Sequence, residues 1–251
     1  MKSRRVLVTG ASGFVGRHLV PYLATNGFEV WAAARSPEEL AAGPGIVPAK
    51  LPDLSDQVVD WSGLVKGCDF VVHLAGIAHA DRDIPEARYQ AVNCDATGSL
   101  AVAARNAGVK RVVYVSSVRA QCGPVADGIL SEADPPGPLD AYGRAKLAGE
   151  AAVSDALAGS DTDWVTLRPV LVYGPGVKGN MMQLSKLARL SLPLPLKTLR
   201  GRRSILSIEN LESAILHCLS ATAAGRKVLL VADETPLLVA DIVASMRHGL
   251  G

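Results

Sequence analysis

A glycine-rich turn near the N-terminus is the feature that most constrains the fold of this chain. The apolar run Val6–Val8 and Thr9 lead directly into this turn, whose glycines Gly10, Gly13 and Gly16 are spaced three apart. The order predicts a strand, a tight turn and a helix. Glycine permits a turn conformation forbidden to other residues, and it lets a ligand and the helix approach the backbone closely. Because bare N–H groups at a helix start suit a diphosphate, the predicted ligand is a dinucleotide.

Strand-like and helix-like segments alternate along the rest of the chain. The expected strands are Arg5–Thr9, Glu29–Ala33, Gly45–Lys50, Phe70–Leu74, Arg111–Ser116, Trp164–Arg168 and Lys227–Val231. The expected helices are Gly13–Thr25, Glu86–Ala107, Ala141–Ala158, Gly179–Leu190, Glu209–Ala223 and Leu238–His248. This alternation predicts an α/β fold with a doubly wound parallel sheet and helices on both faces. Ligands bind such folds at the carboxyl ends of the strands.

The chain has 251 residues, of which 49% are hydrophobic and 4% aromatic. That length suits one large α/β domain with a small appendage. We expect a dinucleotide-binding domain over 1–170, with 204–231 packing back onto it. A small substrate-binding portion is expected from 171–203 and 232–251, and Gly123–Leu139, rich in Pro, Gly and Asp, is expected to be a loop.

Several functional classes are disfavoured by composition. The formal net charge is only +2, which gives no electrostatic case for nucleic acid or membrane binding. No apolar stretch is long enough to span a bilayer. The cysteines are scattered without a C-x-x-C pattern, which predicts reduced thiols in a cytoplasmic protein. The histidines lack metal-ligand spacing, so no metal site is expected, and His73 in an apolar run is expected to be packed.

A second motif combines a tyrosine and a lysine. Tyr142 and Lys146 are four apart in a predicted helix and therefore share a face. We expect the ammonium to lower the pKa of the phenol, which could then exchange a proton while a hydride moves to or from a cofactor. Ser116 and Ser117 end an apolar run, where a hydroxyl could orient the reacting oxygen. Each feature alone is common at surfaces and strand ends, but together they indicate one site.

These segments together resemble the extended short-chain dehydrogenase/reductases of the nucleotide-sugar epimerase/dehydratase family. The resemblance covers nearly the whole chain, and the matching segments are Thr9–Gly16, His73–Gly76, Asn93, Tyr142–Lys146, Arg168–Gly176 and Arg202–Ser204. It implies a Rossmann fold, an NAD(P) cofactor and a catalytic group made of Ser117, Tyr142 and Lys146, with Ser116 as the alternative serine.

The resemblance also implies binding residues. Those for the cofactor are Gly10, Ser12, Gly13, Phe14, Val15, Arg35, Asp53, Leu54, Leu74, Ala75, Gly76, Asn93, Tyr142, Lys146 and Pro169. Those for the substrate are His79, Ser117, Asn180 and Arg203. The guanidinium of Arg203 could bind a diphosphate through two parallel hydrogen bonds.

Departures from the family pattern argue against some of the family's reactions. Val118 and Arg119 occupy the places of the Asp-Glu pair of sugar 4,6-dehydratases, and Cys122 lies too far along for the cysteine of the GDP-fucose synthase type. The remaining reactions are those of a 4-epimerase or a 4-keto-sugar reductase, with Tyr142 as general acid/base. Family members usually have more chain after Lys227–Val231, which suggests as an alternative an NADPH-dependent reductase of a smaller carbonyl compound. A non-catalytic dinucleotide-binding sensor or assembly protein is disfavoured because the catalytic residues are retained.

The residues at the end of the second predicted strand indicate which cofactor, NAD(H) or NADP(H), is preferred. Ala34 occupies the position where NAD-preferring sites place an acid, and Arg35 follows it. An arginine would attract a 2′-phosphate, so NADP(H) is favoured and NAD(H) remains possible. Arg35 could instead face solvent or stack on adenine. The implied partners are a nucleoside-diphosphate sugar and, by family precedent, a second copy of the chain bound through the helices 86–107 and 141–158.

Overall fold

The computed structural model describes residues 4–78, 84–126, 128–177, 179–189, 201–221 and 225–249. Its centre is a parallel sheet of seven strands in the order β10-β6-β5-β4-β1-β2-β3. The strands are β1 (Arg4–Thr9), β2 (Phe28–Ala34), β3 (Ile46–Lys50), β4 (Phe70–His73), β5 (Arg111–Val115), β6 (Asp163–Pro169) and β10 (Lys227–Val231). The order reverses between β1 and β4, which is where a doubly wound sheet opens a ligand-binding crevice. The predicted fold class is confirmed.

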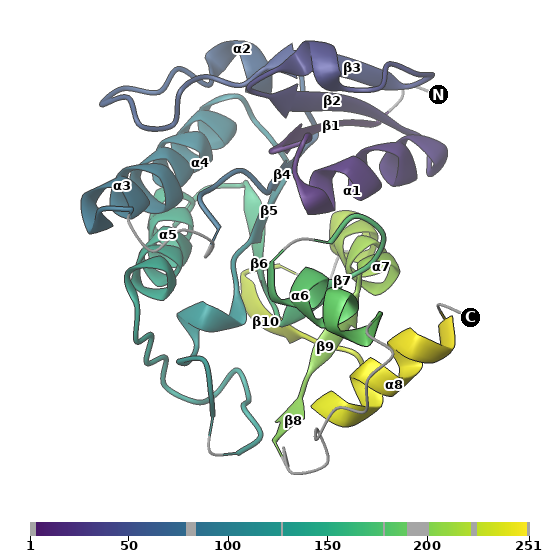
Figure 1. Ribbon diagram of the computed structural model, residues 1–251. Helices are drawn as coiled ribbons and strands as arrows, with labels where there is room; N and C mark the ends of the chain where they lie inside the picture. The colour runs from purple at the N-terminus through teal and green to yellow at the C-terminus, as the bar shows by residue number, and fades with distance from the viewer. Residues whose placement is uncertain are drawn as a thin grey trace.

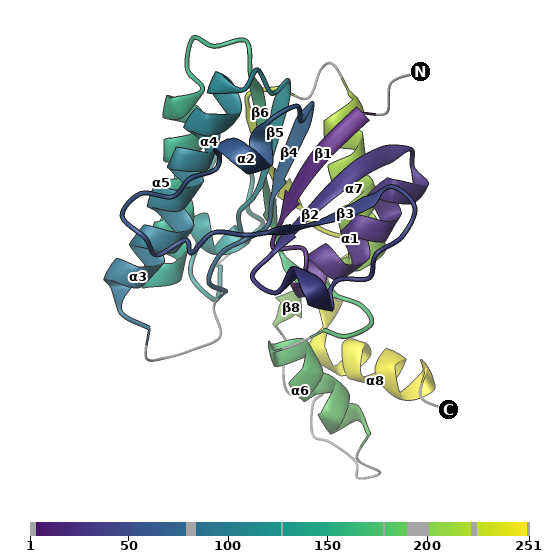
Figure 2. The same cartoon turned by 90° about the horizontal axis from the view of Figure 1, so that it is seen from above.

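Helices cover both faces of this sheet (Figures 1 and 2). On one face α1 (Phe14–Thr25) and α7 (Ile208–Ser220) pack against the strands. The other face carries the short α2 (Ser62–Val65), α4 (Ala96–Asn106) and α5 (Ala141–Ala156). The strands alternate their side chains between the two layers, so that Val6 and Val8 of β1 lie in one core and Leu7 lies in the other. Burial on both faces explains why the central strands β4 and β5 are almost continuously apolar.

The helix predicted over Glu86–Ala107 is interrupted. The structure has α3 (Glu86–Gln90), a π-helical turn (Ala91–Asp95) and then α4. At the π-helical turn the carbonyl of Asn93 accepts hydrogen bonds from the hydroxyls of Thr97 and Tyr114. These side chains satisfy a carbonyl that a regular helix would pair with a backbone N–H.

A smaller unit is built from the segments around and after β6. The parallel pair β7 (Leu171–Tyr173) and β9 (Ile205–Ser207) lies beside the antiparallel pair β8 (Arg202–Arg203) and β11 (Leu237–Leu238). The helices α6 (Gly179–Ala188) and α8 (Val239–Gly249) lie side by side beyond one end of the sheet (Figure 2). Sequence analysis missed the four short strands because two or three residues carry no hydrophobic period. Among the described residues, no helix is long and apolar enough to cross a membrane.

Candidate active site

The glycine turn has the geometry of a phosphate cradle. Gly10 has φ of +71°, and a Cβ there would lie 2.8 Å from the backbone N of Ala75. A Cβ at Gly16 would lie 2.7 Å from the Cα of Ala11, so the helix could not pack as closely on the turn. Gly13 begins α1 without a side-chain cap, and the first turn of α1 has no acidic residue. The uncapped helix start and the bare backbone fit a dinucleotide diphosphate.

Thr9, at the end of β1, joins the glycine turn to the end of β4. Its Oγ1 accepts hydrogen bonds from the backbone N–H groups of Leu74 and Ala75, both at 3.2 Å. The same hydroxyl lies 2.7 Å from Nδ1 of the buried His73. The predicted cofactor residues Leu74 and Ala75 are therefore held against Gly10 by a side chain that sequence analysis did not single out.

His73 continues this chain of hydrogen bonds to the π-helical turn. Its Nε2 lies 3.0 Å from Oγ1 of Thr97, whose own hydrogen goes to the carbonyl of Asn93. Because Thr97 has only one hydrogen to donate, Nε2 carries the proton and Nδ1 accepts from Thr9. Burial, together with the charge of Lys146, lowers the pKa of His73 to about 3. A neutral imidazole therefore braces β1, β4 and the π-helical turn, in agreement with the expectation that His73 is packed.

Asn93 supports the segment that follows β4. Its Oδ1 accepts from the backbone N–H of Ile77 at 2.8 Å, and its Nδ2 donates to the carbonyl of Ile77 at 2.9 Å. A Cβ at Gly76 would lie 2.7 Å from Oδ1 of Asn93 and 3.6 Å from Nζ of Lys146. The structure thus brings three predicted residues, Gly76, Asn93 and Lys146, to one place.

The predicted catalytic serine and tyrosine are also brought together. Ser117, directly after β5, shares a side-chain hydrogen bond with Tyr142 in the first turn of α5. Ser116 is buried, and its hydroxyl donates instead to Glu150 at 2.5 Å. Of the two serines considered, Ser117 is the one that contacts the tyrosine.

The prediction that Lys146 lowers the pKa of Tyr142 is wrong for this structure. Burial raises the pKa of Tyr142, and the hydrogen bond from Ser117 only partly opposes that shift. Nζ of Lys146 donates to the carbonyl of Val115 at 3.0 Å and lies 4.8 Å from the centre of the Tyr114 ring. Burial lowers the pKa of Lys146 itself to about 8, while Glu150 acts in the opposite direction. The lysine is thus a buried ammonium directed at the end of β5.

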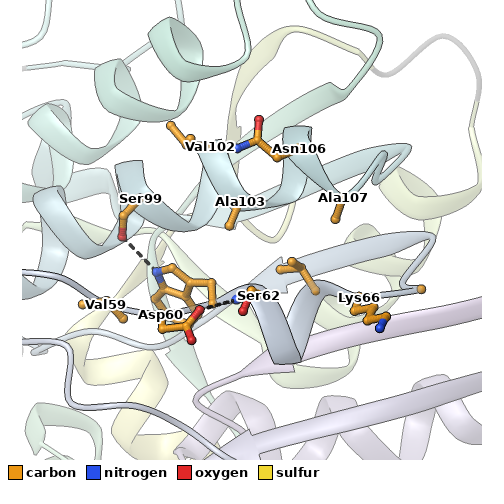
Figure 3. Close-up of a pocket in the computed structure, with 12 residues that line it drawn as sticks. Val59, Asp60, Ser62, Lys66, Ser99, Val102, Ala103, Asn106 and Ala107 are labelled. Carbon is orange, nitrogen blue, oxygen red and sulfur yellow. Dashed lines mark hydrogen bonds between the residues drawn. The ribbon is translucent and has the colours of Figure 1, made fainter.

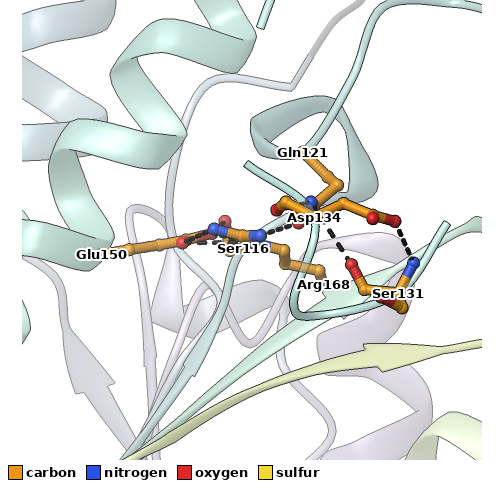
Figure 4. Close-up of polar contacts among 6 residues, drawn as sticks. All are labelled: Ser116, Gln121, Ser131, Asp134, Glu150 and Arg168. Atoms are coloured by element: carbon orange, nitrogen blue, oxygen red, sulfur yellow. Dashed lines mark hydrogen bonds and ion pairs between the residues drawn. The ribbon is translucent and has the colours of Figure 1, made fainter. Parts of the chain in front are cut away.

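A buried ion pair between Arg168 and Glu150 lies next to Ser116, whose hydroxyl donates to Glu150 (Figure 4). Nε of Arg168 on β6 donates to both carboxylate oxygens of Glu150 on α5, at 2.9 and 3.1 Å. Arg168 also donates to the side-chain oxygen of Gln121, which holds the carbonyl of Asp134 at 2.7 Å. The pair therefore ties α5 to β6 and to the loop after Ser117. Sequence analysis did not predict it, although Glu150 continues the four-residue spacing of Tyr142 and Lys146.

The end of β2 shows the residues considered for the cofactor ribose. Ala34 is buried, whereas Arg35 is exposed. Hydrogen bonds from the hydroxyl and backbone N–H of Ser55 lower the pKa of Asp53, with smaller contributions from Arg88 and Arg35. Arg35 and Asp53 therefore lie near each other at this edge. The side chain of Leu54 is instead part of the apolar core.

The other predicted residues fall into two groups. Ser12, Phe14 and Val15 lie at the start of α1, and Pro169 is buried at the end of β6. On the substrate side, Arg203 is exposed on β8, and its guanidinium donates to the carbonyl of Pro124 at 3.2 Å. Asn180 lies at the start of α6, where only its backbone is described, and His79 lies outside the described residues.

A separate hollow of about 440 Å³ lies between α2 and α4 (Figure 3). Its lining includes Asp60, Lys66, Val102 and Asn106. Trp61 also lines it and donates from its indole N–H to Ser99 at 2.9 Å. None of the predicted site residues lines this hollow, so it is distinct from the glycine turn and from Ser117, Tyr142 and Lys146.

Comparisons with known proteins agree with this arrangement. The model of the NAD dependent epimerase/dehydratase family matches residues 6–232. A UDP-glucose 4-epimerase of Vibrio cholerae is 31% identical over 98% of this chain and 76% of its own length. The structure of MoeE5 in complex with UDP-glucose and NAD is 32% identical, with a TM-score of 0.82 over 98% of this chain and 81% of that one. The structure of MoeE5 in complex with UDP-glucuronic acid and NAD is 30% identical in sequence, with a TM-score of 0.83 over 97% of this chain and 81% of that one.

The family model matches most of the chain and therefore assigns the chain to that family. The glycine turn and the residues Ser117, Tyr142 and Lys146 agree with this assignment. The chain belongs to the NAD dependent epimerase/dehydratase family of short-chain dehydrogenase/reductase proteins, whose cofactor is a nicotinamide dinucleotide.

Proposed function

We propose that this protein is a 4-epimerase of a nucleoside-diphosphate sugar. The observation that carries the proposal is the hydrogen bond between Ser117 and Tyr142 at the carboxyl end of β5, with Lys146 one turn further along α5. The relatives support the substrate class, because one is a UDP-glucose 4-epimerase and MoeE5 was solved with two UDP-sugars. Val118 and Arg119 stand where a dehydratase would need acids to expel water.

The roles of the residues follow from their positions. A bound nicotinamide would accept a hydride from the sugar carbon and later return it. Tyr142 takes the proton from the sugar hydroxyl as the carbon is oxidised, and gives it back when the carbon is reduced. Ser117 hydrogen-bonds the same oxygen and holds it near the phenol. Lys146 keeps a positive charge on the same helix face, one turn from the phenolate.

Product analysis with UDP-glucose and UDP-glucuronic acid tests the proposal. An epimerase converts either pure C4 epimer into the same mixture, with no net change in cofactor. A 4-keto-sugar reductase consumes reduced cofactor in proportion to the keto-sugar that it converts to the alcohol, and in the reverse direction with these UDP-sugars it forms reduced cofactor in proportion to the 4-keto product. Turnover of simple carbonyl compounds alone, or of none of these substrates, would contradict the proposed reaction.

The end of β2 favours a second candidate, a 4-keto-sugar reductase that uses NADPH. Ala34 offers no carboxylate to the adenine ribose, and the exposed guanidinium of Arg35, one residue further on, supports binding of a 2′-phosphate. We propose a preference for NADP(H) over NAD(H) on this ground. Reductases consume a reduced cofactor, so such a preference would fit the reductase better than the epimerase.

Arg35→Ala is expected to weaken NADPH binding by about 10- to 150-fold, because the lost charge-assisted hydrogen bonds contribute about 1.5–3 kcal/mol. NADH binding should change little, since NADH lacks the 2′-phosphate. Fluorescence titration of both reduced cofactors gives the two dissociation constants. Arg105→Ala, which removes an exposed arginine of α4, is the matched control. Equal losses for NADPH and NADH, or tighter binding of NADH by the unmodified protein, would refute the preference.

A further inference from the structure

An ion pair borders the Ser117–Tyr142 contact and has no role in the proposed reaction so far. The guanidinium of Arg119 pairs with the carboxylate of Asp140, and their side chains are only 17% and 27% exposed. Arg119 belongs to the short 3-10 turn after Ser117, whereas Asp140 directly precedes α5. The pair therefore joins the two segments that carry the serine and the tyrosine.

Arg119 holds Ser117 through its backbone. Its N–H donates to Oγ of Ser117 at 3.1 Å, so this oxygen already accepts one hydrogen bond. The hydroxyl hydrogen of Ser117 remains available for the phenol oxygen of Tyr142, with which Ser117 shares a hydrogen bond. The backbone N–H of Arg119 thereby helps to orient the hydroxyl of Ser117.

Asp140 holds the start of α5. Its Oδ1 accepts from the backbone N–H of Gly143 at 2.7 Å and so caps the turn that contains Tyr142. Arg119 packs against this turn so closely that a Cβ at Gly143 would lie 3.1 Å from its carbonyl carbon. The side chain and the backbone of Arg119 thus fix the same turn of helix.

We propose that Arg119 and Asp140 form a positioning pair that holds the Ser117 hydroxyl and the Tyr142 phenol in register and balances the charge beside that phenol. The inference rests on the proposed role of Tyr142. The contacts of both residues are with Ser117 and the first turn of α5, and it is through these that the pair acts. Among the described residues, Nε of Arg119 is buried without a hydrogen-bond partner, so this guanidinium is not fully compensated by its neighbours.

Because Arg119 and Asp140 carry opposite charges, removing each charge should move the pKa of Tyr142 in an opposite direction. The groups that act on Tyr142 are Ser117, Asp140, Tyr89, Arg119 and Tyr114 of β5, with Lys146 following on α5. The cation of Arg119 lowers the pKa of the phenol, whereas the carboxylate of Asp140 raises it. Arg119→Gln should therefore shift the rise of kcat/KM with pH to higher pH, and Asp140→Asn should shift it to lower pH.

Both variants are chosen to preserve the fold. Asparagine is as good a helix cap as aspartate and can still accept from Gly143, and glutamine keeps most of the arginine stem. Arg119→Lys retains the cation and should restore most of the original profile. The matched control is Arg144→Gln on α5, which breaks the exposed ion pair with Glu86 of α3 and should leave the profile in place.

The experiment is a set of pH profiles of kcat/KM with the UDP-sugar that the protein turns over. A titration of phenolate absorbance, each variant minus the same variant carrying Tyr142→Phe, measures the phenol directly. Shifts of opposite sign support the inference. Shifts of the same sign, or lower activity with an unmoved profile, would overturn it and leave the proposed function standing. If Tyr142→Phe retained wild-type turnover, the proposed function itself would fail.

Discussion

Tyr142→Phe is expected to lower kcat by about 10²–10⁴-fold, the usual contribution of a positioned general acid/base. The substitution removes the phenol oxygen, which shares a hydrogen bond with Ser117, and leaves the ring that packs edge-on against Tyr89 at 6.2 Å. Folding and cofactor affinity should therefore change little. Steady-state kinetics with a UDP-sugar, cofactor titration and thermal unfolding separate these three properties.

Tyr22→Phe is the matched control, because this tyrosine lies on α1, on the other side of the sheet from α5. It should leave kcat unchanged. Wild-type kcat in Tyr142→Phe would contradict the role assigned to the phenol. A loss of cofactor affinity as large as the loss of kcat would point to a binding role instead.

Arg168→Met is expected to lower the free energy of unfolding by about 3–5 kcal/mol, because it leaves the buried carboxylate of Glu150 without its cation. The side chains of Arg168 and Glu150 are 7% and 6% exposed, so water cannot replace the lost hydrogen bonds. Urea denaturation followed by circular dichroism measures the change. The substitution should also disturb the loop held through Gln121, and hence the region around Ser117.

Two comparisons make this prediction specific. Arg144→Met breaks the exposed pair with Glu86, whose side chains are 48% and 62% exposed, and should cost no more than about 1 kcal/mol. The double variant Arg168→Met with Glu150→Leu should lose less stability than the sum of its single substitutions, because it leaves no unpaired charge. Equal effects of Arg168→Met and Arg144→Met would show that burial does not strengthen the inner pair.

Local sequence patterns were sufficient for the central sheet. Most of its strands are short apolar runs, and most of the long connections have helical composition, so the type of these elements could be predicted without tertiary information. The break in the helix predicted over Glu86–Ala107 could not be predicted this way. The contacts at the break are between segments distant in sequence: Tyr114 of β5 donates to the carbonyl of Asn93, and a Cβ at Gly149 of α5 would lie 2.8 Å from the Tyr114 hydroxyl.

The candidate site also has features that follow from local sequence and features that depend on tertiary contacts. The glycine turn and the Tyr142–Lys146 spacing are local, and the structure brings the residues around them together. The direction of the pKa shift of Tyr142 was predicted wrongly because it is set by burial, which only the folded chain defines. The pairs Glu150–Arg168 and Arg119–Asp140 join segments far apart in sequence. The four-residue spacing of Glu150 after Lys146 was the one available sequence signal for the inner pair.

The fate of the hydrogen at C4 tests the central claim most directly. UDP-glucose carrying deuterium at C4 is converted in the presence of the cofactor, and the product is analysed by mass spectrometry and NMR. Because a hydride that passes to the nicotinamide and back does not exchange with water, we predict a C4 epimer that retains its deuterium, together with transient absorbance of reduced nicotinamide. Loss of the deuterium to solvent during conversion, without reduced nicotinamide, would contradict hydride transfer in this site.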